Sequence, residues 1–75
     1  MISEIDIADF DRMPVESLYK IPRETYIQLP ISEHVFFFDH IDGAYSFCRD
    51  MFGDIAHISA FAMVHPLVRK DPAKQ

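Results

Sequence analysis

Hydrophobic and polar residues alternate along much of the second half of the chain, and this two-residue period predicts β-strands. Residues 24–30 (ETYIQLP) would place threonine, isoleucine and leucine on one face and tyrosine and glutamine on the other. Residues 55–61 (IAHISAF) and 62–68 (AMVHPLV) predict two further strands. The last should lie at a sheet edge, because Pro66 has no N–H to donate to a ladder.

Residues 35–50 (VFFFDHIDGAYSFCRD) predict a β-hairpin. Asp42 and Gly43 stand between two β-rich runs, and Asp-Gly is a strong hairpin signal because both central residues of a type I′ turn take positive φ. With these two as the loop, Ile41 would pair with Ala44.

In that register both faces of the hairpin are largely apolar. One face would carry Phe36, Phe38, His40, Tyr45 and Phe47. The other would carry Val35, Phe37, Ile41, Ala44 and Cys48, together with Asp39 and Ser46. A core of this size can absorb only one face. The N-terminal segment, through Ile5, Ile7 and Phe10, or a partner molecule should cover the other.

A partner or second subunit on this face would use aromatic anchors, which are amphipathic and dominate many interfaces. The predicted interface residues are Tyr26, Phe36, Phe38, His40 and Tyr45.

The N-terminal part has a different pattern. Pro14 suits the first turn of a helix, and the apolar spacing in 14–20 (PVESLYK) predicts one or two helical turns. We therefore divide the chain into an acidic arm with a short helical element (1–22), a β-barrel-like domain (23–68) and a polar tail (69–75).

Together these elements predict a mainly-β fold, with a short N-terminal helix before a small curled antiparallel sheet or barrel of four to five strands. In residues 53–64 (GDIAHISAFAMV), a strand, a one-turn SAFA segment and a short closing strand resemble the end of SH3-like small barrels. The resemblance covers about residues 23–68. The chain lacks tryptophan and an ALYDY-like aromatic cluster, so a proline-rich ligand is not implied.

The composition narrows the classes of partner. The 75 residues include 12 acidic and 7 basic side chains, for a formal net charge of −5, which makes direct nucleic-acid binding unlikely. Cys48 is the single cysteine and cannot form an internal disulfide. The sequence shows no apolar run of about 20 residues and no basic n-region, so we expect a cytoplasmic protein without a membrane segment.

Two clusters could carry chemistry. His40 and Asp42, with Asp39 or His34, carry side chains of the kinds that bind divalent metals. However, a turn favours aspartate at position 42, and a metal site needs three or four converging ligands. Cys48 with His57 or with His40 could form a nucleophile and base. A buried structural cysteine is the commoner situation. We expect no catalytic residue, metal or cofactor.

Two functions remain as hypotheses. The first is a small non-enzymatic module that binds and modulates another protein; its compact acidic design resembles small accessory or inhibitor proteins of bacteriophages. The second is a homo-oligomer that binds a small ligand in a pocket between subunits, lined by tyrosine and histidine.

Overall fold

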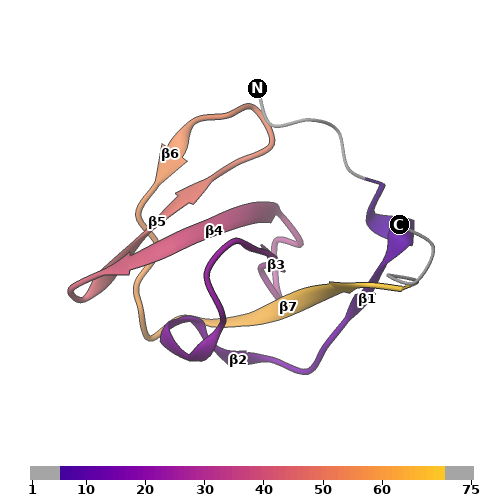
Figure 1. Cartoon of the computed structure of the whole chain (residues 1–75), viewed down its shortest axis with the longest axis horizontal. Coiled ribbons are helices and arrows are strands. Elements are labelled where there is room, and N and C mark those ends of the chain that lie inside the picture. The colour runs from indigo at the N-terminus through magenta and orange to yellow at the C-terminus, as the bar shows by residue number, and fades with distance from the viewer. Residues whose placement is uncertain (1–5, 71–75) are drawn as a thin grey trace.

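The computed structural model describes residues 6–70, which form one antiparallel sheet with two short 3-10 turns (Figure 1). The elements are η1 (Ile7–Asp9), β1 (Phe10–Arg12), β2 (Glu16–Ser17), η2 (Leu18–Lys20), β3 (Thr25–Gln28), β4 (Val35–Asp42), β5 (Tyr45–Arg49), β6 (Ile55–Ala56) and β7 (Met63–Arg69). The strand order is β1-β7-β3-β4-β5-β6, and β2 also pairs with β7. The mainly-β, antiparallel prediction is confirmed, while the seven-stranded sheet is not closed into a barrel.

The predicted helix at 14–20 is wrong for most of its length. Residues 16–17 are strand, and only Leu18–Lys20 forms a single 3-10 turn. One isolated helical turn is unstable in water. The segment instead follows the edge of β7, where Phe10 pairs with Arg69 and Ser17 with Met63. The first part of the chain is therefore an edge of the sheet.

The hairpin between β4 and β5 is present, but its loop lies one residue later than predicted, so Ile41 pairs with Ser46 in place of Ala44. Asp42 pairs with Tyr45, so Gly43 and Ala44 are the two loop residues. Of these two, only Gly43 has a positive φ, at 66°. This pattern matches a type II′ turn, which takes glycine at its first central position, and differs from the predicted type I′ turn.

The shifted loop leaves the faces as predicted, but a β-bulge at Asp39 changes them. Phe38 pairs with Cys48, whereas His40 pairs with Phe47, so Asp39 is the extra residue between them. The predicted common face is consequently wrong: Phe38 points into the core, and His40 and Phe47 lie on the opposite side. A single inserted residue has this effect because side chains alternate with a period of two.

The core lies on one face of the curled sheet. Its buried cluster contains Leu18, Ile21, Ile27, Phe38, Cys48 and Val64. One polar side chain, Ser46, is buried among them; its hydroxyl donates to the Ile58 carbonyl at 2.8 Å. That bond offsets the cost of removing the hydroxyl from water.

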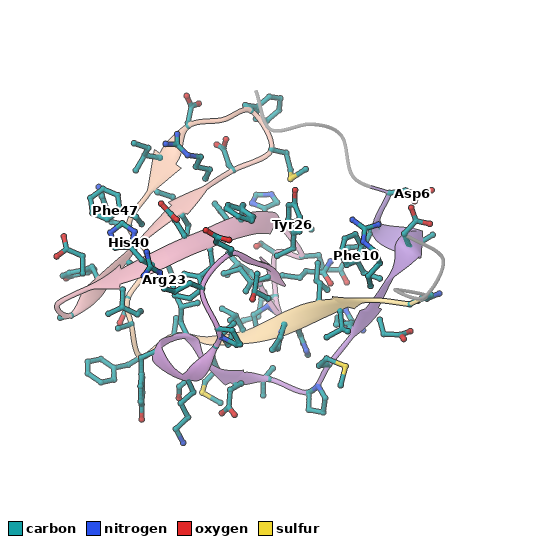
Figure 2. The ribbon with its side chains drawn as sticks, in the orientation of Figure 1. Asp6, Phe10, Arg23, Tyr26, His40 and Phe47 are labelled. Atoms are coloured by element: carbon teal, nitrogen blue, oxygen red, sulfur yellow. The ribbon has the colours of Figure 1, made fainter. Side chains whose placement is uncertain are left out.

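A second, smaller apolar layer lies on the other face. The ring of Tyr26 lies beside that of Phe10, with centroids 5.6 Å apart (Figure 2). It also contacts Phe37, with centroids 5.2 Å apart. Leu67 of β7 is 4% exposed and lies outside the core cluster. The first part of the chain therefore contributes to covering this face through Phe10, as expected of an arm, whereas Ile7 is 44% exposed. The remaining arm residue, Ile5, lies outside the described residues.

Replacing Gly43 with valine should destabilise the protein by about 1 kcal/mol or more, because a β-branched residue resists positive φ. No heavy atom lies within 4 Å of a Cβ built at this position, so the effect would come from the backbone alone. Gly43→Asn should cost less, since asparagine tolerates this region. Thermal melts of the two variants test the turn, and an equal melting temperature for Gly43→Val and the wild type would contradict it.

Candidate functional site

The five residues predicted to form an interface do not share one surface. Phe38 is fully buried and Phe36 packs against the core, so both of these aromatic side chains belong to the core and its margin. Tyr26 is half-buried within the second apolar layer, and His40 is half-buried beside Phe47. Tyr45 is the most exposed of the five, at 57%.

Tyr45 belongs to an exposed cluster whose other members the sequence did not predict. We call this cluster the aromatic corner and define it as Tyr19, Tyr45, Phe61 and Met63. Tyr19 and Phe61 form an edge-to-face pair with ring centroids 5.7 Å apart. Met63 is held beside Ser17, whose hydroxyl donates to the methionine sulfur at 3.4 Å.

Backbone hydrogen bonds around the loop at 59–61 assemble the corner from distant segments. The Tyr19 N–H donates to the Ala60 carbonyl at 2.9 Å, and the Ala60 N–H donates to the Ala44 carbonyl at 2.8 Å. Tyr45 forms an isolated bridge with Ser59. The turn η2, the hairpin loop and the 59–61 loop therefore meet at one point of the surface.

The aromatic corner leaves large apolar side chains exposed to solvent. Phe61 is 68% exposed and Tyr19 is 49% exposed, although both are large aromatic residues in a chain with a small core. The Lys20 ammonium lies 5.9 Å from the Tyr19 ring centroid, so one cation borders the corner. Aromatic side chains of this exposure, collected from several segments, are typical of binding surfaces.

The sequence pattern missed Phe61 because alternation in IAHISAF predicts a strand. The structure instead has a turn at Ala60–Phe61, where the Ala60 N–H donates to the Ala44 carbonyl and the Phe61 N–H donates to the Ser59 hydroxyl. A phenylalanine flanked by two alanines in a predicted one-turn segment was the available signal, since a small turn cannot bury a large ring.

Two of the four histidines, His40 and His57, contact the ring of Phe47. His40 stacks on the Phe47 ring at 4.9 Å, and His57 meets it edge-on at 4.7 Å. Asp39 lies 3.4 Å from His40, and His57 Nδ1 is 3.0 Å from the Ser46 carbonyl oxygen. Aromatic packing and backbone hydrogen bonding thus explain the positions of both imidazole rings. Within residues 6–70 no group of three or more histidine, cysteine or acidic side chains is placed to hold a metal ion.

Cys48 is buried, and its thiol is not paired with a base. Burial raises the pKa of the Cys48 thiol, a hydrogen bond with Ser46 lowers it, and the negative charge of Asp39 raises it further. The sulfur lies 3.3 Å from the Ser46 hydroxyl, whereas His57 bonds to the Ser46 carbonyl. The thiol is therefore held in its neutral form, which is the unreactive form of cysteine.

No protein-family model matches the chain, and neither a curated protein nor a solved structure matches it. Residues 6–70 contain no helix with the length and apolar character needed to cross a membrane.

Proposed function

We propose that this protein is a small non-enzymatic interaction module that binds another protein through the aromatic corner. The observation that carries the proposal is the exposure of Phe61, Tyr19 and Tyr45, at 68%, 49% and 57%. Tyrosine and phenylalanine supply much of the binding energy at protein interfaces, because they bury a large area while losing few rotamers.

The shape of the corner supports the same proposal. Its rings are carried by η2, the β4–β5 hairpin and the loop before β7, all of which are tied together by backbone bonds. A surface that is already ordered before binding loses less conformational entropy on association. The phenolic hydroxyls and Lys20 would provide polar contacts at the margin of an apolar contact.

The fold supports a modular role by analogy alone. The order β7-β3-β4-β5-β6 places the last strand beside the first of the five, as expected of an SH3-like module, although this sheet remains open. An accessory or inhibitory role, of the kind found among small bacteriophage proteins, is the corresponding biological hypothesis. It draws on the small size, the acidic charge and the neutral, buried Cys48.

The experiment compares two exposed phenylalanines in capture from an extract of the native host. Phe61→Ser alters the corner, while Phe52→Ser alters a ring that is 79% exposed in the loop at the opposite end of β5. We expect the wild type and Phe52→Ser to capture the same partner protein in similar amounts. Phe61→Ser should capture about tenfold less of it, the effect of losing one hot-spot residue.

Melting temperatures of both variants should match the wild type, because each side chain is mostly exposed. Benzophenone-phenylalanine placed at position 61 should also crosslink to the captured protein, whereas the same group at position 52 should not. Equal capture by both serine variants would show that the corner is not the binding surface. A crosslink only to a second copy of the chain would assign the corner to self-association.

A further inference from the structure

Met63 brings an oxidisable thioether into the aromatic corner. Its side chain is 48% exposed, so a small oxidant in solution can reach it. Met63 follows Phe61 by two residues, and its strand partner Ser17 precedes Tyr19 by two residues. Two residues of chain span at most about 7 Å. The Ser17–Met63 pair therefore adjoins the pair of rings formed by Tyr19 and Phe61.

The sulfur of Met63 has a polar neighbour on one side. The Ser17 hydroxyl donates to this sulfur at 3.4 Å, and the pairing of Ser17 with Met63 holds the two side chains together. A thioether sulfur is a weak acceptor with two lone pairs, of which the hydroxyl uses one. The second lone pair faces away from Ser17 and is left for an oxidant.

The other methionines in the described part of the chain have different surroundings. Met13 is 40% exposed, but within residues 6–70 no hydrogen bond reaches its sulfur. Met51 is half-buried and lines a hollow beside Phe52. Among these three methionines, Met63 combines exposure, a polar contact at the sulfur and a place in the proposed binding surface.

From these observations we infer that Met63 is an oxidative modification site that regulates the aromatic corner; this inference rests on the proposed binding role of the corner. The oxidant is a hydroperoxide. The sulfur lone pair that faces away from Ser17 attacks a peroxide oxygen, and the S–O bond forms as the O–O bond breaks. The departing oxygen takes the proton and leaves as water or an alcohol. The thioether loses two electrons to the peroxide and becomes a sulfoxide.

The sulfoxide weakens binding because it places a polar oxygen on an apolar surface. Oxidation turns methionine into a polar, chiral side chain, and this change disrupts interfaces that contain methionine. A partner that packs on Tyr19 and Phe61 would have to remove water from the new oxygen, which costs free energy unless a hydrogen bond replaces the water. Enzymatic reduction of the sulfoxide restores the thioether, so the change is reversible.

The capture experiment compares each full-length protein before and after treatment with hydrogen peroxide, which is removed before a desalted host extract is added. Treated wild type should capture about fivefold less partner than untreated wild type, within the range for one interface residue. Met13→Leu should show the same loss. Met63→Leu should show no loss relative to its own untreated sample, because leucine has no sulfur to oxidise. Peptide mass spectrometry measures the sulfoxide at each methionine.

The stereochemistry of the sulfoxide tests the contact with Ser17. The oxidised protein is digested, and the peptides are treated with one of two methionine sulfoxide reductases, each of which reduces one epimer. At Met63 one epimer should exceed the other by about threefold or more, the ratio that a weak hydrogen bond gives. Met13 should give nearly equal epimers, and Ser17→Ala should make the two epimers at Met63 nearly equal.

These measurements separate this inference from the proposed function. Without any capture by untreated wild type the proposed function fails, and the NMR signals of the Tyr19 and Phe61 rings then decide whether oxidation of Met63 alters the corner. Unchanged ring signals would overturn the inference, as would equal capture by wild type with and without the sulfoxide. An equal loss of capture by treated Met63→Leu would place the sensitive group elsewhere, for example at Cys48. Equal epimers at Met63 in the wild type would contradict attack on the side away from Ser17.

Discussion

Replacing Phe38 with alanine is expected to lower the free energy of unfolding by about 3–5 kcal/mol, the range for a large aromatic residue removed from a core. The side chain is fully buried in the cluster with Ile27 and Cys48, at the centre of the sheet. A small domain has few kcal/mol of stability to lose, so a large unfolded fraction at 25 °C is the expected result. Urea titration followed by circular dichroism measures it.

The matched control is Phe52→Ala, which removes the same atoms from a ring that is 79% exposed. This change should alter the free energy of unfolding by no more than about 0.5 kcal/mol. Similar losses for the two variants would contradict the buried position of Phe38. They would also remove the reason for excluding Phe38 from the predicted interface.

Deleting residues 1–13 should produce the second large effect, a chain that aggregates or fails to fold. The deletion removes β1, three residues of which pair with β7, and the hydrogen bond from Met13 to Pro66. It also removes Phe10, leaving Tyr26 and Leu67 uncovered. A long unpaired strand edge next to exposed apolar residues is a site of aggregation.

Light scattering and circular dichroism of the truncated chain test this expectation. A shorter deletion of residues 1–5 separates the part played by β1 from that of the preceding residues. The variant Phe10→Ala tests the side chain while keeping the strand, and it should lie between the wild type and the full deletion. A truncated chain that stays monomeric and equally stable would show that β7 needs no neighbour on that edge.

The aromatic corner results from side chains that a small core leaves outside, at the place where η2 and two loops meet.

Much of the fold could be predicted because it rests on local patterns. Alternation in residues 24–30 and 35–50 predicted β3, β4 and β5, and Asp42-Gly43 predicted the hairpin. These signals are local: a strand shows its period in a few residues, and a tight turn needs glycine at a particular position.

The candidate sites depended on relations that no local pattern contains. Phe61 lies on the surface in a loop that is held by residues far away in the sequence: the Ala60 N–H donates to the Ala44 carbonyl, and the Ala60 carbonyl accepts from the Tyr19 N–H. Contacts between segments so far apart in the sequence are set by the fold of the whole sheet.

The sequence by itself determined that this chain forms an antiparallel β-fold with a hairpin at Asp42-Gly43 and more apolar side chains than one face can bury. Only the tertiary structure decided which of those side chains are buried. One extra residue at Asp39 exchanged the faces of the hairpin beyond it, placing Phe38 in the core and His40 on the opposite side. Side chains alternate at every residue, so one inserted residue reverses the faces of the part of the strand beyond it, and the register follows from packing across the sheet.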